Sequence, residues 1–178
     1  MMSLPTDRRS FLLALGALGI VQGLPTDDSA QVIALNGFVL GPREGEHLIH
    51  FRDHGNIFIK ISAGTLAVGT QQVMHGSGIP VHRHLHMEEA FCVLEGSGTV
   101  TLNDVPHSFE KGASIFIPRN TWHGFANPDQ ELLLLWMMSP AGLDGFFRET
   151  CSPPGAPAKQ LSREQIREIA RKYGTEFR

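Results

Sequence analysis

Two histidines separated by one residue, His82 and His84, restrict the fold of this 178-residue chain more than any other feature. Alternate residues of a β-strand point to the same side of a sheet, so a strand here directs both imidazole rings to one side. Glu89 follows shortly afterwards, and His123 occurs much later in the chain. Imidazole and carboxylate groups together bind borderline divalent metals better than they bind calcium or magnesium. The pattern therefore predicts that these four side chains hold one divalent transition metal (Fe, Mn, Ni, Zn or Cu) between strands.

Short segments rich in Val, Ile, Phe and Thr, separated by Gly, Pro, Asn and Asp, occupy the middle of the chain. They lie at 56–61, 66–74, 90–94, 98–102, 114–117, 122–126 and 132–137. Regular short strands with turn signals between them are typical of an all-β sandwich or barrel. The absence of helical patterns between the segments argues against a βαβ architecture. Asn103-Asp104 has the composition of a hairpin turn between two strands.

The residues around the histidines resemble the two sequence motifs of the cupin family. The first motif is matched by Gly76, His82, His84, Glu89 and Gly96, and the second by Gly112, Pro118, His123 and Asn127. Asn120 stands where the second motif has a glycine, and asparagine tolerates a positive φ better than other non-glycine residues. The resemblance implies a single jelly-roll β-barrel over residues 32–140 that forms a homodimer. It also implies that His82, His84, Glu89 and His123 are the metal ligands.

The resemblance leaves three functions open, because cupins include dioxygenases of the quercetin type, isomerases, lyases and non-catalytic binding proteins. The leading hypothesis is a metal-dependent oxidoreductase of the dioxygenase type that acts on a small organic substrate. Glu89 would then serve as a metal ligand or leave the metal and act as the general base. The second hypothesis is a metal-dependent lyase or isomerase without an oxygen requirement. The third is a barrel that binds a small molecule without chemical conversion.

Side chains that share a strand face with the ligands predict an apolar pocket around the metal. Phe91 and Val93 alternate with Glu89, and Phe125 alternates with His123, although packing in the core explains these residues equally well. His86 is a further pocket candidate, with an exposed turn position as the alternative. Other candidate lining residues are Met74, His75, Phe116, Trp136 and Met138, whereas His47, His50, His54 and His107 are expected in loops or at the surface.

The first residues of the chain predict an export signal. Asp7-Arg8-Arg9-Ser10-Phe11-Leu12 precedes a short apolar stretch and resembles the twin-arginine signature, which predicts a signal peptide at 1–23 and a polar linker at 24–31. The mature protein is then periplasmic or secreted, with no membrane contact after signal removal. An uncleaved N-terminal helix is the alternative. A formal net charge of −3 gives no basic surface for nucleic acid, so we expect a small-molecule substrate instead.

Residues 141–178 predict a short helical tail after the barrel. One helix is expected at Gly142–Glu149, and a second begins after Ser162, which forms a capping box with Gln165. Gly174 is expected to end the second helix. We expect this tail to pack on the outside of the barrel without a role in the site. Cys92 and Cys151 are the only cysteines, and Cys92 is expected to face away from the barrel interior.

Overall fold

The computed structural model describes residues 37–127 and 129–178, so the predicted signal peptide (1–23) and linker (24–31) lie outside the described residues. The strands are β1 (Glu46–Ile49), β2 (Asn56–Ser62), β3 (Ala67–Val73), β4 (Gly78–His84), β5 (Glu88–Glu95), β6 (Ser97–Leu102), β7 (Val105–Glu110), β8 (Ser114–Ile117), β9 (His123–Ala126), β10 (Leu132–Ser139) and β11 (Thr175–Phe177). The helices are α2 (Leu143–Thr150) and α3 (Arg163–Lys172). Neither of these helices is long and apolar enough to cross a membrane.

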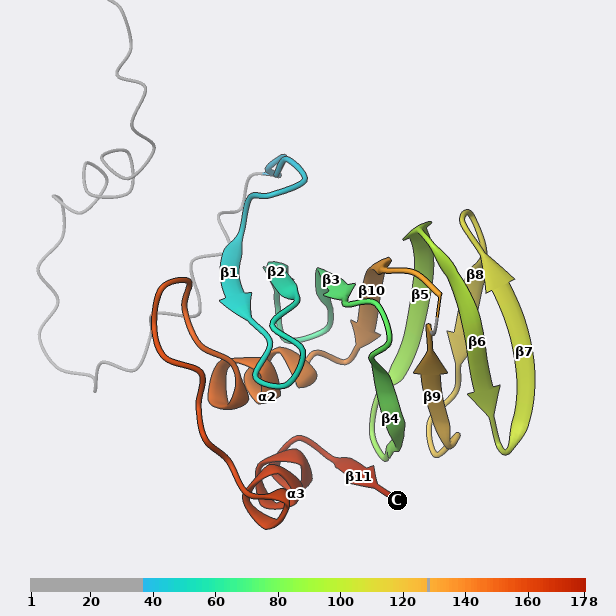
Figure 1. The fold of residues 1–178 in the computed structure, drawn as a ribbon. Coiled ribbons are helices and arrows are strands. Elements are labelled where there is room, and N and C mark those ends of the chain that lie inside the picture. Colours follow the sequence, from blue (N-terminus) through green and yellow to red (C-terminus); the bar gives the residue numbers. More distant parts are fainter. Residues whose placement is uncertain (1–36, 128) are drawn as a thin grey trace, which may run out of the picture. The chain divides into compact units, whose positions relative to one another are not determined.

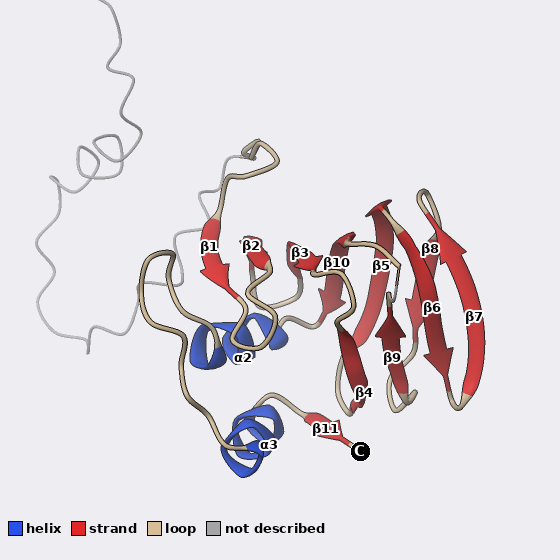
Figure 2. Cartoon of the chain, in the orientation of Figure 1, coloured by secondary structure: helices blue, strands red, loops and turns tan. Residues whose placement is uncertain are grey.

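The strands form two antiparallel sheets, which confirms the predicted all-β jelly roll (Figures 1 and 2). One sheet has the order β1-β2-β3-β10-β5-β8, and the other has the order β11-β4-β9-β6-β7. Strands that are distant in the sequence are therefore neighbours, because β10 lies between β3 and β5, and β9 lies between β4 and β6. This topology brings the two halves of the histidine pattern into adjacent strands.

The core follows the two-residue alternation that the sequence predicts. In β5, Phe91 and Val93 are buried, whereas Cys92 between them is partly exposed, as expected from its parity. Alternate residues of β10 are also almost fully buried: Leu132, Leu134, Trp136 and Met138. Cys92 and Cys151 are both free thiols.

Two turns adopt the backbone conformation that their residues favour. Asn103 and Asp104 have φ angles of 45° and 69° and connect β6 with β7, as expected for a tight hairpin. Asn120 has a φ of 62°, so asparagine takes the left-handed conformation at the position where the family pattern has glycine. Asn120 also donates its backbone N–H to the carbonyl of His84, which fixes this turn beside β4.

The C-terminal tail contains both predicted helices and one strand that was not predicted. Ser162 and Gln165 form the expected capping box at the start of α3, and Gly174, with a φ of 64°, follows its last turn. The chain then forms β11, which pairs antiparallel with β4 so that Thr175 lies opposite His84 and Phe177 opposite His82. The prediction of a purely helical tail outside the site was therefore wrong. A three-residue strand is too short to show a sequence periodicity.

Candidate metal centre

Four buried side chains converge from three strands. His82 and His84 come from β4, Glu89 comes from β5 and His123 comes from β9. One potential ligand atom from each residue lies within 4.8 Å of the others, and all four residues are at most 6% exposed. His82 and His123 are direct partners in the β4–β9 register, so their side chains extend from the same face of that sheet. The structure thus brings together all four residues predicted to bind a metal.

Hydrogen bonds from the outer nitrogen of each histidine ring fix the ring orientation. The Nδ1 atoms of His82 and His123 lie 2.8 and 2.9 Å from the carbonyl oxygens of Pro80 and Thr121. A carbonyl can only accept, so each Nδ1 carries the proton and donates it, which leaves the Nε2 lone pair free in the neutral ring. His84 Nδ1 lies 2.9 Å from the hydroxyl oxygen of Thr175.

The inner atoms of the cluster lack the partners that buried polar atoms require. His84 Nε2, His123 Nε2 and Glu89 Oε2 are buried without a hydrogen bond among the described residues. Glu89 Oε2 lies 3.3 Å from His84 Nε2 and 3.1 Å from His123 Nε2. Unpaired buried polar atoms are costly, and a cation between the nitrogen lone pairs and the carboxylate oxygen would satisfy all of them. The donor set therefore fits a divalent transition metal.

The protonation states of His82 and Glu89 are those that metal binding needs. Burial, followed by the nearby His123 and His84, lowers the pKa of His82 well below its usual value. Burial opposes ionisation of Glu89, but the neighbouring His84 and His123 outweigh burial and lower the Glu89 pKa below its usual range. Neutral imidazole and ionised carboxylate are the forms that coordinate metals, so His82 and Glu89 need no proton release before binding.

A cavity of about 410 Å³ opens beside the cluster, and His82 and Glu89 are part of its wall. Its apolar lining comes from both sheets and from the tail: Phe51, Ile79, Phe91, Trp136, Met138, Leu143, Phe146, Phe147, Ile166 and Phe177. Polar and charged lining residues include His50, Gln71 and Thr175 as well as four arginines. The arrangement resembles a small-molecule site in which a few polar groups orient a largely apolar ligand.

The predicted pocket residues occupy three different environments. Phe91 lines the cavity as predicted. Val93 and Phe125 are buried in the core instead, where the Phe125 ring contacts Phe91 at a centroid distance of 4.8 Å. His86 is exposed in the turn after β4 and packs beside Gly174, so of its two predicted placements the exposed turn is the one that the structure shows. The strand ends at His84, and the parity that would have directed His86 inward ends with it.

Among the other candidates, Trp136 and Met138 line the cavity, whereas Phe116 is 60% exposed and His75 lies at the surface. His54 and His107 are exposed as expected, and His47 is half-buried. His50 lies in the loop after β1, in keeping with the expectation, but it is only 4% exposed and belongs to the cavity wall. Asp53, three residues later, is its hydrogen-bond partner, and this spacing was the only sequence signal for the pair.

The fold and the cluster together define a class of protein, a jelly roll with a buried three-histidine, one-glutamate centre beside an apolar cavity. Residues 69–139 match the cupin domain model, which contains all four cluster residues. An RmlC-like cupin from Shewanella frigidimarina has the same fold, with a TM-score of 0.54, 22% identity and coverage of 61% of this chain and 95% of that one. Residues 69–139 of the chain form a cupin domain.

Of two relatives that match the chain, one has a name that states an enzyme activity and the other has a name that states none. Protein SchB of Streptomyces halstedii is 29% identical over 118 residues, which cover 65% of this chain and 81% of SchB. The dimethylsulfoniopropionate lyase DddW of Ruegeria pomeroyi is 30% identical over 88 residues, which cover 49% of this chain but only 57% of DddW.

Replacing Thr175 by valine is expected to lower the metal affinity about 10–100-fold, the usual effect of losing a partner that orients a ligand histidine. Valine keeps the shape of Thr175 but removes the hydroxyl that holds His84 Nδ1. A chelator competition titration measures the change. Thr150→Val is the matched control, because the equally buried Thr150 hydroxyl bonds the Phe146 carbonyl. Equal metal affinities for both variants would contradict a role of Thr175 at the centre.

Proposed function

We propose that this protein is a metal-dependent enzyme that acts on a small, largely apolar organic anion, with a dioxygenase-type oxidation as its reaction. The observation that carries the proposal is the position of the cluster in the cavity wall, where His82 and Glu89 are both accessible to a ligand. Three imidazoles and one carboxylate leave further coordination positions for a substrate, unlike a closed structural site. When bound, the metal supplies Lewis-acid charge and a template for substrate oxygen atoms.

The residues of the chain supply enclosure and orientation. Phe91, Trp136 and Met138 line the cavity and are each at most 3% exposed, so they exclude water from the substrate side of the centre. Electrostatic interactions are stronger in such an apolar environment than in water. A flat aromatic or enolic substrate fits a wall built largely of aromatic side chains. Glu89 would hold the metal or, if displaced from it, accept a proton from the substrate.

Arginines in the cavity lining support an anionic substrate. The lining includes Arg52, Arg163, Arg167 and Arg178. Arg178 is paired with Asp104, and Arg52 donates to the carbonyl of Gly78. Arg163 and Arg167 form no salt bridge within the described part of the chain, and both are exposed one turn apart on α3. A guanidinium fork binds carboxylate in a bidentate manner, so these two side chains are available for an acidic substituent.

A lyase or isomerase reaction is the second candidate. Its support is the similarity to DddW, a relative whose name states a lyase activity on dimethylsulfoniopropionate, itself an organic carboxylate. The cluster can orient a carbonyl or carboxylate next to the bond that breaks without any need for oxygen. The two candidates share the same centre and the same cavity, and they differ in whether oxygen is consumed.

Oxygen uptake by metal-loaded protein distinguishes the candidates. Flavonols, catechols and β-diketones are supplied as neutral compounds and as carboxylate-bearing analogues, for example catechol and 3,4-dihydroxybenzoate. We expect oxygen consumption and a lower KM for the carboxylate of each pair, with Glu89→Gln protein as the inactive control. Product formation without oxygen would replace the dioxygenase proposal by the lyase or isomerase. A ligand that stabilises the protein but is recovered unchanged would contradict both.

A further inference from the structure

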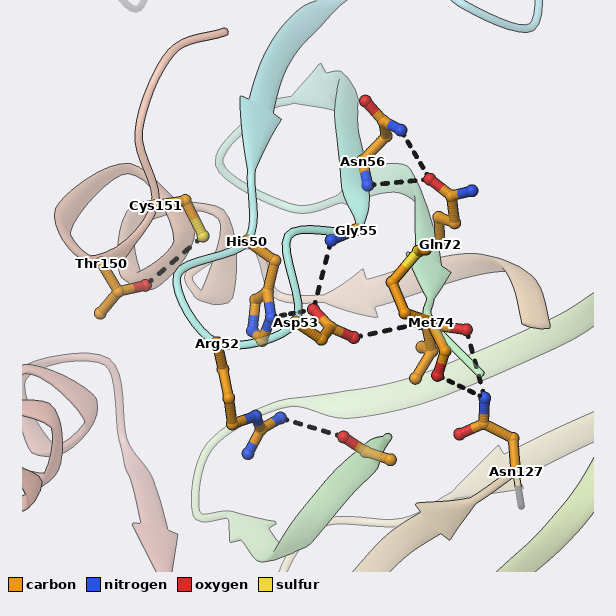
Figure 3. Close-up of polar contacts among 12 residues, drawn as sticks. His50, Arg52, Asp53, Gly55, Asn56, Gln72, Met74, Asn127, Thr150 and Cys151 are labelled. Atoms are coloured by element: carbon orange, nitrogen blue, oxygen red, sulfur yellow. Dashed lines mark hydrogen bonds and ion pairs between the residues drawn. The ribbon is translucent and has the colours of Figure 1, made fainter. Parts of the chain in front are cut away.

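A buried histidine and a buried aspartate form a second polar pair in the loop between β1 and β2. His50 Nδ1 lies 2.6 Å from Asp53 Oδ1, and the two side chains are 5% and 6% exposed. Asp53 also accepts hydrogen bonds from the backbone N–H groups of Gly55 and Met74, at 3.3 and 3.2 Å (Figure 3). The carboxylate is thus held between the imidazole ring and the backbone N–H groups of Gly55 and of Met74, the residue that follows β3.

The loop that carries this pair is rigidly built. The backbone N–H of His50 donates to the carbonyl of Gly55, and that of His54 donates to the carbonyl of His50. A Cβ at Gly55 would lie 2.0 Å from the carbonyl oxygen of Gln72, so only glycine fits where the loop meets β3. The orientation of the His50 ring is therefore determined by the backbone of its own loop and by Asp53.

The two nitrogens of the His50 ring differ, because Nδ1 is hydrogen-bonded to Asp53 and Nε2 has no such partner among the described residues. Burial opposes ionisation of Asp53, but the hydrogen bonds from His50 and from the backbone lower its pKa below the usual range. An ionised carboxylate can only accept, so His50 Nδ1 donates and the neutral ring keeps its lone pair on Nε2. Within the described part of the chain Nε2 has no hydrogen-bond partner, and His50 belongs to the wall of the cavity that also contains Glu89.

We propose that His50 is the acid–base catalytic residue of this cavity and that Asp53 is its positioning residue. The inference deepens the proposed function, because it assigns proton transfer to a residue outside the metal cluster. The geometry matches the general pattern of a base whose second nitrogen is oriented by a carboxylate. Its substrate class is an organic acid or enol with an acidic C–H or O–H bond.

The proposed step is a single proton transfer. The C–H or O–H bond of the substrate breaks, an N–H bond forms at His50 Nε2, and the electron pair of the broken bond stays on the substrate as an enolate or phenolate. The positive charge of the imidazolium lies beside the Asp53 carboxylate, which stabilises it. The proton returns to the product or to water before the next turnover. Glu89 can then remain with the metal cluster instead of leaving it to act as the base.

The proposal requires that His50 Nε2 is unprotonated and open to the cavity, and acylation by diethyl pyrocarbonate tests this requirement. This reagent reacts with unprotonated imidazole nitrogens, and peptide mass spectrometry locates each modified histidine. In the wild-type protein we expect modification of His50 through the cavity despite its burial, with the exposed His54 of the same loop as an internal standard. An unmodified His50 beside a modified His54 would overturn the proposal, because Nε2 would then be inaccessible.

The Asp53→Asn variant tests the role of the carboxylate. Loss of the orienting carboxylate in a Ser-His-Asp triad leaves the histidine in the wrong tautomer, and the same change here would place the proton on Nε2. We therefore expect His50 modification to slow at least about tenfold relative to His54. A loosened loop would expose His50 and accelerate its modification, so a structural effect has the opposite sign. An unchanged or faster reaction of His50 would overturn the assignment. The wild-type measurement stands on its own if this variant does not fold.

The turnover rate of a His50 variant is the second test of the proposal. With a substrate found by the oxygen or anaerobic assay, His50→Gln is expected to lower kcat about 10²–10⁴-fold, the usual contribution of a general base. Its metal content should equal that of the wild type. His54→Asn is the matched control, because asparagine tolerates the φ of 60° at this position. Full activity of His50→Gln would overturn the proposal. A protein without any turnover but with a reactive His50 would instead contradict the proposed function alone.

Discussion

Replacing His123 by alanine is expected to lower the affinity for a divalent transition metal roughly 100–1000-fold. Structural zinc sites bind with about 10–16 kcal/mol, so each of four ligands contributes about 2.5–4 kcal/mol, and every 1.4 kcal/mol is a factor of ten. His123 is fully buried and lies opposite His82 in the β4–β9 register, so no exposed side chain can take its place. Equilibrium titration against a chelator of known affinity measures the loss.

The control for this prediction is His107→Ala, which removes an exposed histidine of β7 outside the cluster. Its metal affinity and metal content should equal those of the wild-type protein. If His123→Ala kept its metal while His107→Ala lost it, the ion would be bound at the surface. An unchanged affinity in both variants would show that the buried cluster does not hold the metal.

Replacing Trp136 by alanine is expected to destabilise the protein by about 3–5 kcal/mol, the usual cost of deleting a large aromatic side chain from a core. Trp136 is 0% exposed in β10, its ring lies 5.6 Å from that of Phe147, and its pairing partner in β3 is Gly69. A Cβ at Gly69 would lie 2.2 Å from the tryptophan ring, so the absent side chain of this glycine makes room for the indole. Denaturant unfolding measures the free-energy change.

Phe116→Ala provides the matched control in the same sheet. Phe116 is 60% exposed on β8, and substitutions at such surface positions usually change the free energy of unfolding by less than about 0.5 kcal/mol. A loss below about 1 kcal/mol for Trp136→Ala would contradict the packing of β10 against β3 and α2, since cores rarely absorb so large a cavity. Because Trp136 also lines the cavity, the variant should bind cavity ligands more weakly even where it remains folded.

Residue alternation and motif spacing predicted the part of the molecule that depends on local patterns. The separation of His82 and His84 by one residue predicted their shared face, and the parity of β5 predicted that Glu89 and Phe91 point inward while Cys92 does not. The turn at Asn120 was also predictable, because its backbone conformation depends mainly on the residue itself. Such features need no knowledge of distant contacts.

The features that the sequence did not predict concern residues whose environment depends on distant segments. Thr175 reaches His84 only because β11 pairs with β4, and no local pattern indicates that pairing. His50 was expected in a loop and lies in one, but its burial was not predictable, because residues of β4, α2 and α3 line the same cavity as His50. His86 follows the parity of His84 in the sequence, but its strand ends before it. Tertiary contacts, which a single sequence does not display, determined all three positions.

Anomalous X-ray diffraction from crystals of the metal-loaded protein tests the central claim most directly. We expect one anomalous peak, about 2.0–2.2 Å from Nε2 of His82, His84 and His123 and from a carboxylate oxygen of Glu89. Crystals of His123→Ala prepared in the same way should lack that peak. A wild-type protein with no peak between these four side chains, or with its metal bound only at other residues, would contradict the account.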